Sequence, residues 1–453
     1  MKKTKIVCTI GPASNNEEML RKMIEAGMNV ARFNFSHGSH ETQKNNLDLV
    51  KKVREEMGVA VATMMDTKGP EIRFRDFENG KITLKRDQEF ILSTEEFLGN
   101  ENRGSITYKG LPQDVKVGNL LLINDGLVQL EILETGEKEI KTKVLVGGDV
   151  LNHKGINAPG ADLKMPFISE QDKKDILFGI EQDYDYIALS FVRTAKDVEA
   201  VRAILDFNDS KMKIIAKIES TQGVENLEGI LAAADGLMVA RGDMGVELPP
   251  EQVPYIQKQM IDMTNAAGKI SICATQMLES MTHNPRPTRA EVGDVANAVY
   301  EGVSAVMLSG ESAAGEYPLE SVQMMAKIAE ETESHIYSEY NPDDLTQRSI
   351  VGKAACDLAD RLGVDKIIVY TDTGRSPGVV SQIKPITPIM VMTRNEKVYH
   401  QSALLYGVEP VRIADIIEEV NLEQKTREYM KSSGIESAVL LFGKAIDSIK
   451  VLN

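Results

Sequence analysis

Three charged residues near the middle of the chain have the types and spacing of a metal and anion site. Lys217 and Glu219 lie two positions apart at the end of the apolar run 214–218, and Asp243 follows the run 237–240. Side chains two residues apart on a strand share a face, so Lys217 and Glu219 should point the same way. If the two runs are neighbouring parallel strands, roughly 5 Å apart, Glu219 and Asp243 can hold one divalent ion beside the Lys217 ammonium. Such a site suits a phosphorylated substrate. A buried salt bridge is the alternative that these residues alone leave open.

The composition is that of an ordinary globular protein. The 453 residues, enough for about three domains, are 42% apolar and 26% charged, and the net charge is −16. This charge argues against nucleic acid or an anionic membrane as a partner, although a bound cation can still attract a phosphorylated substrate. No stretch approaches membrane-spanning length. Cys8, Cys273 and Cys356 each lie in an apolar run, which predicts reduced core thiols in a cytoplasmic protein.

Short apolar runs alternate with amphipathic segments over most of the chain, which is the pattern of strand–helix units around a parallel sheet. The predicted strands are residues 5–9, 29–33, 61–66, 186–191, 213–218, 236–240, 270–274 and 304–308. The predicted helices are residues 17–26, 42–56, 170–181, 196–206, 225–233, 253–266, 289–301 and 319–331. Eight such units close a (β/α)8 TIM barrel, whose site lies at the carboxyl ends of its strands. Polar residues crowd there, which favours a functional site: Arg32, Asn34, Asp66, Lys68, Glu219, Asp243, Thr275 and Glu311.

Two further regions differ in pattern from the barrel. Residues 74–163 contain the strand-like runs 81–84, 90–92, 120–124, 128–132 and 141–146, which predict a small inserted antiparallel β-barrel domain that could act as a lid. Residues 341–453 contain the runs 366–370, 388–392, 410–413 and 438–442, which predict a C-terminal open-sheet α/β domain. The fold class is therefore α/β, with residues 1–73 and 164–340 forming the two parts of the barrel.

Several segments of the chain carry distinctive motifs: TKIVCTIGPAS (4–14), NVARFNFSHG (29–38), MDTKGPEIR (65–73), AKIES (216–220), MVARGDMG (238–245), ICATQMLESM (272–281) and NPRPTRAE (284–291). Together these segments resemble pyruvate kinase. The resemblance spans almost the whole chain, the inserted domain included. It implies glycolytic phosphoryl transfer from phosphoenolpyruvate to ADP, which gives pyruvate and ATP, and a homotetrameric assembly. Phosphoryl transfer consists mostly of positioning and charge neutralisation, which fits the predicted cluster of cations and metal.

The resemblance also implies roles at the reacting centre. Glu219 and Asp243 would bind Mg²⁺ (or Mn²⁺), and Lys217 would stabilise charge on the phosphoryl group and the enolate. Arg32 would bind the phosphate, and Thr275 would help a water deliver the proton to the enolate carbon. The backbone around Ala240, Gly242 and Asp243 would hold the substrate carboxylate at the start of a short helix. Taken alone, Arg32 reads as a surface ion pair, Gly242 as a turn glycine and Thr275 as a helix N-cap.

Two further ligand sets follow from the same resemblance. The ligands of K⁺ would be Asn34, Ser36, Asp66 and Thr67. Family members with a glutamate at the position of Glu71 tend to need K⁺, so K⁺ activation is expected. The nucleotide contacts would be Asn34, Ser36, His37, Arg73 and Lys154. The chain departs from the usual pattern around the lid at Phe74-Arg75, where Thr-Gly is usual, and at Ala158, where Leu is usual.

A possible effector site lies in the third region. Thr371, Thr373, Gly374, Arg375 and Ser376 follow a predicted strand and could hold a phosphate with backbone N–H groups, hydroxyls and a guanidinium. Regulated relatives bind a sugar phosphate at a similar segment, but they also carry a Gly-rich loop near the C-terminus. Residues 442–447 lack that loop, so activation by fructose bisphosphate is not expected, and another phosphorylated effector or none stays open.

Two other functions compete with the kinase. Metal-dependent lyases or aldolases that act on phosphoenolpyruvate or pyruvate also use a metal held by two carboxylates, but they generally lack the inserted lid and the nucleotide and K⁺ contacts. The other alternative is an inactive regulatory paralogue. Inactive relatives typically lose the lysine or a metal carboxylate, whereas Lys217, Glu219 and Asp243 are all present here.

Overall fold

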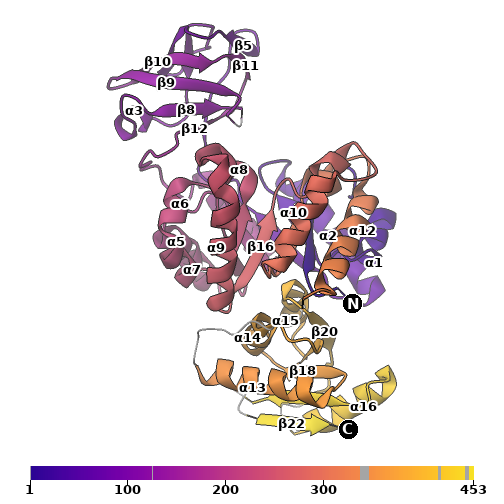
Figure 1. Ribbon diagram of the computed structural model, residues 1–453. Coiled ribbons are helices and arrows are strands. Elements are labelled where there is room, and N and C mark those ends of the chain that lie inside the picture. The colour runs from indigo at the N-terminus through magenta and orange to yellow at the C-terminus, as the bar shows by residue number, and fades with distance from the viewer. Residues whose placement is uncertain (1, 125, 337–345, 417–419, 444–447, 453) are drawn as a thin grey trace.

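Eight parallel strands close into a barrel at the middle of the molecule, with a β domain at one end and an α/β domain at the other (Figure 1). The computed structural model describes residues 2–124, 126–336, 346–416, 420–443 and 448–452. Two predicted features lie outside these ranges. They are the domain boundary between residues 340 and 341, and residues 444–447 of the segment expected to lack a Gly-rich loop. Within the described ranges, no helix has both the length and the apolar character needed to cross a membrane.

The barrel strands follow the order β1-β17-β16-β15-β14-β13-β3-β2. Their bounds are β1 Lys5–Thr9, β2 Val30–Asn34, β3 Ala62–Asp66, β13 Tyr186–Leu189, β14 Lys213–Ile218, β15 Gly236–Ala240, β16 Ile270–Ala274 and β17 Ala305–Leu308. The TIM barrel is thus confirmed, and β1, β14, β15 and β16 begin and end where the sequence predicts. The strand predicted to run to residue 191 ends at Leu189 instead, because Phe191 turns the chain with a left-handed φ of 56°.

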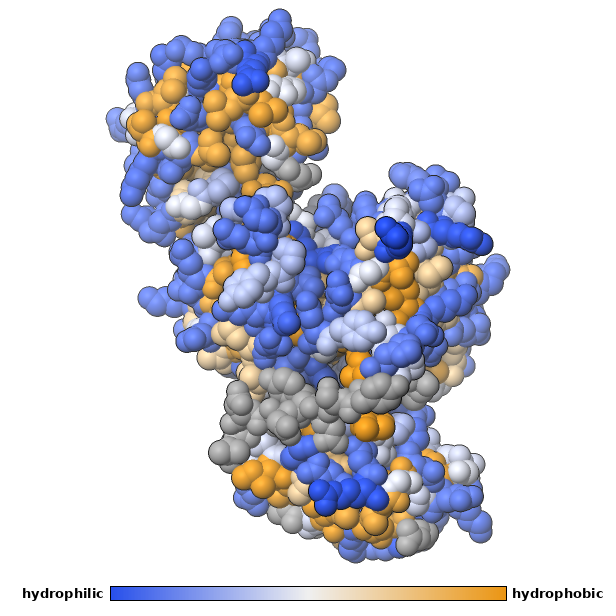
Figure 2. Space-filling view, viewed as in Figure 1, coloured by the Kyte–Doolittle hydropathy of each residue, from blue (hydrophilic) through white to orange (hydrophobic). Residues whose placement is uncertain are grey.

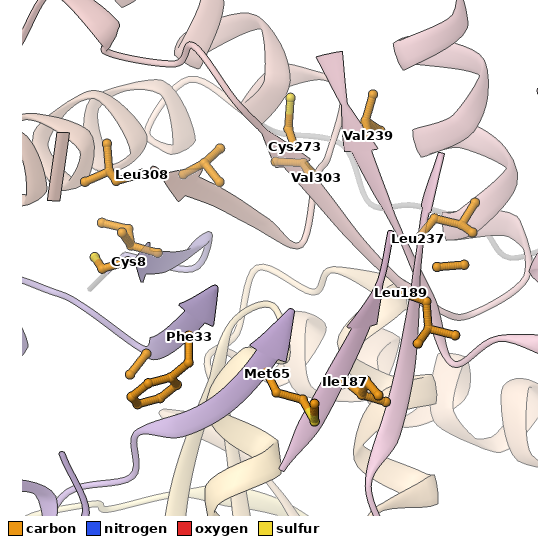
Figure 3. Packing of buried hydrophobic residues seen from close by; sticks show 14 of the residues in the cluster. Cys8, Phe33, Met65, Ile187, Leu189, Leu237, Val239, Cys273, Val303 and Leu308 are labelled. Atoms are coloured by element: carbon orange, nitrogen blue, oxygen red, sulfur yellow. The ribbon is translucent and has the colours of Figure 1, made fainter. Parts of the chain in front are cut away.

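Alternate strand residues serve two different cores. One set, which includes Phe33, Met65 and Leu237, points outward and packs under the surrounding helices (Figure 3). The other set fills the barrel interior, and this apolar cluster continues without a break into the C-terminal domain. This second core is therefore common to the barrel interior and one face of the C-terminal sheet, whereas the other face of that sheet has a separate core.

Helices surround the barrel strands. They are α1 Glu17–Glu25, α2 His40–Met57, α4 Glu170–Glu181, α5 Ala195–Phe207, α6 Thr221–Glu225, α7 Leu227–Ala233, α8 Arg241–Glu247, α9 Val253–Ala266, α10 Arg289–Tyr300, α11 Gly310–Ala313 and α12 Pro318–Glu333. Side-chain oxygens of Asn16, Ser39, Ser169 and Thr288 accept the first free backbone N–H groups of α1, α2, α4 and α10 and so fix where these helices start. The short helix that the family resemblance implies after residue 240 is present as α8, whereas the short helices α6 and α11 are not predicted.

The inserted domain consists of a seven-stranded sheet, in the order β4-β12-β8-β9-β10-β6-β7, and a two-stranded sheet, β11-β5. Its elements are β4 Ile72–Arg73, β5 Lys81–Leu84, β6 Glu89–Ser93, β7 Arg103–Ser105, α3 Leu111–Asp114, β8 Leu120–Ile123, β9 Val128–Thr135, β10 Glu139–Val146, β11 Gly148–Leu151 and β12 Gly155–Asn157. Among the described strands of this domain, the pairings are antiparallel except that of β6 with β7. Strand β4 belongs to this sheet, so the sheet begins two residues before the predicted start of the domain. Figure 2 shows apolar side chains on the visible face of this domain. Leu127 is one apolar residue of the domain that is largely exposed, at 73%.

The C-terminal domain is an open sheet in the order β20-β19-β18-β21-β22. Its elements are α13 Gln347–Leu362, β18 Lys366–Tyr370, α14 Arg375–Ile383, β19 Ile389–Thr393, α15 Glu396–Gln401, β20 Val408–Arg412, α16 Leu422–Ser433, β21 Ala438–Phe442 and β22 Ser448–Leu452. The four predicted strands are present. The fifth strand, β22, was not predicted and is the only antiparallel member among the described strands of this sheet.

Candidate active site

Two neighbouring strands bring Lys217, Glu219 and Asp243 to one rim of the barrel. Strands β14 and β15 are parallel neighbours in which Lys217 pairs with Met238 and Ile218 with Val239. Glu219 therefore leaves the end of β14 beside the end of β15, and Asp243 lies in the first turn of α8, directly after β15. The parallel pairing on which the metal prediction depends is present.

Lys217 is the centre of a buried charge cluster. Its Nζ lies 3.1 Å from Asp66 Oδ1 and 3.1 Å from Glu219 Oε1, and it donates to Ser190 Oγ at 2.7 Å. Arg32 Nε donates to the other Asp66 oxygen at 2.6 Å. The side chains of Arg32 and Lys217 are only 9% and 10% exposed, and those of both carboxylates 1%. Two cations and two anions therefore share one poorly hydrated volume. The interpretation of Arg32, taken alone, as a surface ion pair is wrong, because its side chain is buried.

Burial and charge set the protonation states within this cluster. Burial tends to lower the pKa of Lys217, but Asp66 and Glu219 outweigh it, so the pKa is raised and the ammonium is retained. Burial likewise tends to raise the pKa of Asp66, but Arg32 and Lys217 reverse the effect and lower it. Burial raises the pKa of Glu219 to about 7, although Lys217 opposes this, while Asp243 adds to the rise. Glu219 is thus the carboxylate that gains most from a further nearby cation.

Thr275 connects the next strand to the short helix α8. It lies directly after β16 with a left-handed φ of 67°. Its Oγ1 accepts the Gly242 N–H at 2.8 Å and donates to the Ala274 carbonyl at 2.6 Å. A Cβ at Gly242 would lie 3.3 Å from that Oγ1, so glycine allows the close approach. Thr275 therefore contacts the start of α8, which precedes it in the chain. The interpretation of Thr275, taken alone, as the N-cap of a helix that follows it is wrong.

The predicted K⁺ ligands lie on adjacent strands. Asn34 and Asp66 are partners in the β2–β3 register. The Asn34 Oδ1 accepts the Ser36 N–H at 3.0 Å, and the Thr67 Oγ1 accepts the Ser190 N–H at 3.3 Å. The four oxygen-bearing residues thus come from two consecutive strand ends, and the Asp66 carboxylate is shared with the cluster around Lys217.

A cavity of about 420 Å³ separates the barrel rim from the inserted domain. Glu71, Arg73 and Lys154 line it from the side of the inserted domain, and Asp243 lines it from the barrel. Arg73 and Glu71 form an ion pair at 2.6 Å, so the predicted nucleotide contact and the predicted K⁺ determinant touch each other. Asn34, Ser36 and His37 are not among the lining residues. The structure therefore gathers only part of the predicted nucleotide set in this cavity.

Comparisons with known proteins identify the family. Residues 1–322 match the family model described as "Pyruvate kinase, barrel domain", and residues 350–441 match "Pyruvate kinase, alpha/beta domain". The chain belongs to the pyruvate kinase family. The predicted family, fold class and class of enzyme, a phosphotransferase, are thereby confirmed.

Relatives named pyruvate kinase match along most of the chain. The protein from Sporosarcina psychrophila is 45% identical over 444 residues, which cover 95% of this chain and 75% of the relative. The protein from Staphylococcus aureus (strain MRSA252) is 46% identical over 419 residues, which cover 91% and 72%. A crystal structure of a pyruvate kinase from Cryptosporidium parvum has a TM-score of 0.95 at 36% identity and covers 100% of this chain and 96% of that one. The chain is therefore similar to pyruvate kinases in all three regions, and pyruvate kinase activity is the function that these matches support.

Sequence reasoning missed the loop after β13, which contacts the charge cluster around Lys217. Ser190 accepts from Lys217, and the Phe191 N–H donates to Glu219 Oε2 at 2.5 Å. Glu247, which accepts from Asn157 at 3.1 Å, was missed as well. Ser190 and Phe191 were assigned to the strand itself, and this assignment concealed the turn that points them at the site.

The predicted effector segment forms a tight turn in the C-terminal domain. The Thr371 Oγ1 accepts the N–H groups of Thr373 and Gly374, at 3.2 and 2.9 Å. Gly374 has a left-handed φ of 74°, and α14 begins at the next residue, Arg375. Ser376 is buried, whereas Thr373 and Arg375 are exposed. The five residues thus lie together in the C-terminal domain, which is on the other side of the barrel from the inserted domain (Figure 1).

Proposed function

We propose that the protein transfers the phosphoryl group of phosphoenolpyruvate to ADP at this barrel rim and releases pyruvate and ATP. The observation that carries the proposal is the buried contact of Lys217 with two carboxylates, beside Arg32. A phosphorylated enol brings several negative charges, and a buried ammonium and guanidinium of fixed position can neutralise them without reorganisation. Family membership favours this reaction over the lyase or aldolase alternative.

Glu219 and Asp243 would hold a divalent ion, Mg²⁺ or Mn²⁺. Among the residues that the structure describes, no three His, Cys, Asp or Glu side chains gather to hold an ion. The protein would supply the two carboxylates of Glu219 and Asp243, and substrate and water would supply the other ligands. This donor set suits Mg²⁺, which keeps several waters and binds few protein carboxylates beside substrate phosphates. When bound, the ion supplies charge neutralisation to the transferring group and the enolate. The Glu219 carboxylate, which burial disfavours in its charged form, fits that role.

The side chains around this ion position would divide the work. Lys217 holds its proton and would donate to the phosphoryl group and the enolate oxygen as charge moves onto them. Arg32 would orient the phosphate, held in place by its bond to Asp66. The turn at Ala240 and Gly242 would hold the substrate carboxylate beside Asp243. Thr275 would place the water that delivers a proton to the enolate carbon. These roles follow the family resemblance, and the buried contacts of Arg32 and Lys217 with Asp66 support those of the two cations.

K⁺ would lie at the oxygens of Asn34, Ser36, Asp66 and Thr67, with Glu71 as the feature that makes it necessary. The nucleotide would contact Arg73 and Lys154 in the cavity and approach Asn34, Ser36 and His37 when the inserted domain, residues 74–163, closes as a lid. We place the enzyme in the cytoplasm as a homotetramer.

Pyruvate release, measured with and without ADP, Mg²⁺, Mn²⁺ and K⁺, tests the proposal. We expect release to require ADP and a divalent ion, and to fall when tetramethylammonium replaces K⁺. Release of pyruvate without ADP would support the lyase alternative, and no release under any condition would support the inactive paralogue. A full rate in K⁺-free tetramethylammonium buffer would refute the role given to Glu71.

A phosphorylated effector would bind at the turn formed by Thr371, Thr373, Gly374, Arg375 and Ser376. The exposed Arg375 guanidinium and the backbone N–H groups at the start of α14 suit a phosphate. The test is the kinetics of the wild type and of Arg375→Ala across a panel of sugar phosphates and nucleoside monophosphates. An effect that the substitution abolishes supports the site, and identical kinetics with every compound would make the turn purely structural.

A further inference from the structure

The loop of residues 190–193 contacts the charged centre at its first two positions. The Ser190 Oγ accepts from Lys217 Nζ at 2.7 Å and donates to the Thr67 carbonyl at 2.7 Å. The Phe191 N–H donates to Glu219 Oε2 at 2.5 Å. This part of the loop therefore helps to fix both the ammonium of Lys217 and the carboxylate of Glu219.

The last residue of the same loop contacts the segment that leads back from the inserted domain to the barrel. We call residues 158–165 the return segment. The Arg193 guanidinium donates to the carbonyls of Leu163 and Met165, at 2.8 and 2.9 Å. The rigid planar fork of arginine suits two acceptors at once, which the single ammonium of lysine cannot match with the same geometry. The Arg193 side chain is 12% exposed, and Phe191, Arg193, Leu163 and Met165 all line the cavity between the two domains.

The loop between these two ends has little freedom to move. Phe191 is held at a left-handed φ of 56°, a conformation that is sparsely populated for an aromatic residue and tends to mark functional sites. A Cβ at Gly69 would lie 2.6 Å from the Ser190 carbonyl oxygen, and one at Gly223 would lie 2.7 Å from that of Val192. The backbone on both sides therefore packs directly against the loop, which limits the ways in which the loop can absorb a shift of Arg193 without disturbing Ser190 and Phe191.

We propose that Arg193 is a positioning residue that couples the return segment to Lys217 and Glu219 through Ser190 and Phe191. When the return segment is seated on Arg193, the loop holds the ammonium and the carboxylate in the arrangement described here. When the segment shifts with the inserted domain, the loop loosens its hold on both. The reacting groups would thus be fully aligned only while the inserted domain is correctly placed. This inference rests on the catalytic roles proposed above for Lys217 and Glu219.

Substitutions of Arg193 and of a matched arginine test the coupling. Arg202 is the control, because it lies on α5, the helix that follows the loop, and its guanidinium likewise donates to two oxygens, Asp235 Oδ2 at 2.7 Å and the Ala233 carbonyl at 3.3 Å. We expect Arg193→Met to lower kcat on the order of 10- to 100-fold, because small displacements of reacting groups are costly. Arg193→Lys should lie between Arg193→Met and the wild type. Arg202→Met should keep the wild-type kcat while shifting the melting temperature about as much as Arg193→Met does.

A double-mutant cycle separates coupling from simple loss of stability and remains usable if Arg193→Met does not fold. Arg193→Lys is combined with Ser190→Ala, and kcat is measured for both single variants and the double variant. Because the two side chains act on Lys217 through one loop, their effects on kcat should be less than additive. Additive effects, or a kcat for Arg193→Met equal to that of Arg202→Met, would overturn the inference. The proposed function would stand or fall separately, on whether the wild type releases pyruvate in the presence of ADP.

Discussion

Buried lysines lie at both ends of the barrel, and the structure surrounds them in opposite ways. At the carboxyl end, Lys217 contacts Asp66 and Glu219, and these carboxylates raise its pKa. At the amino end, Lys5 donates to the backbone carbonyl of Val408 at 2.7 Å, and burial, aided by Lys2, lowers its pKa to about 7. The first lysine keeps its charge, whereas the second is close to losing it at neutral pH.

The different partners of these lysines indicate different roles for the two ends of the barrel. The amino end is where the C-terminal domain docks (Figure 1). Lys3 donates to the carbonyls of Pro385 and Ile386, at 3.0 and 3.1 Å, and Lys384 donates to that of Gly302. Backbone carbonyls offer direction without a compensating charge, which suits docking between domains. Carboxylates preserve a full charge in a dry volume, which suits the neutralisation of a phosphate. Burial of a lysine is therefore a weak signal of a site until its partners are known.

Replacing the two lysines by the same residue should give the largest contrast. Lys217→Met removes the ammonium that would stabilise the developing negative charge, so we expect kcat to fall by roughly 10³-fold or more. Lys5→Met is the matched control, at the other end of the same barrel, and should leave kcat within about two-fold of the wild type. Steady-state pyruvate release measures both. A comparable loss in the two variants would show that the contrast between the ends has no catalytic meaning.

A smaller effect is expected from the carboxylate beside Lys217. Glu219→Gln keeps the shape of the side chain but removes the charge that would bind the metal, so the Mn²⁺ concentration needed for half-maximal rate should rise on the order of 10- to 100-fold. Glu333 at the amino end, which accepts the N–H groups of Lys3 and Thr4, is the control. Glu333→Gln should leave the Mn²⁺ requirement unchanged. An unchanged requirement in Glu219→Gln would remove Glu219 from the metal site.

The sequence predicts the carboxyl end of the barrel well because its signals are local. The spacing of Lys217 and Glu219 follows the period of a strand, and the strands that carry them and precede Asp243 have the bounds expected from their apolar runs. Family motifs supplied the roles of these residues, which spacing alone left open between a site and a salt bridge. The parallel neighbourhood of the two strands then follows from the alternation of strands and helices.

The sequence fails where backbone geometry or distant contacts decide. The left-handed turn at Phe191 directs its backbone N–H at Glu219. Every residue except proline has such a donor, so the residue types in the sequence do not indicate which one will contact the site. The role of Lys5 depends on a carbonyl 403 positions away, which no local pattern can reveal. Strand β22 is half exposed and pairs at the edge of its sheet, so its residues lack the apolar run that marked the buried strands.

The smallest expected effect concerns the pH dependence of stability at the amino end. The pKa of Lys5 is about 7 in the folded protein and about 10.4 in an unfolded chain, so between these values the unfolded chain binds more protons. The free energy of unfolding therefore rises with pH in this range. Lys5→Met lacks this contribution. Between pH 7 and 9.5 the free energy of unfolding of the wild type should therefore rise by about 1 to 3 kcal/mol more than that of the variant. Urea unfolding followed at several pH values measures the difference.

The titratable neighbours of Lys5 are the same in the wild type and in Lys5→Met, so the difference between their pH curves reports on Lys5. Lys2, whose own pKa burial lowers to about 8, remains in both proteins, as do Glu333 and Glu409, which oppose the shift of Lys5. Their titration therefore largely cancels when the two pH curves are subtracted. If the curves run parallel, Lys5 keeps its proton throughout, and Glu333 and Glu409 do for it what Asp66 and Glu219 do for Lys217. The two ends of the barrel would then hold their lysines in the same charged state, and only the identity of the hydrogen-bond acceptor would distinguish them.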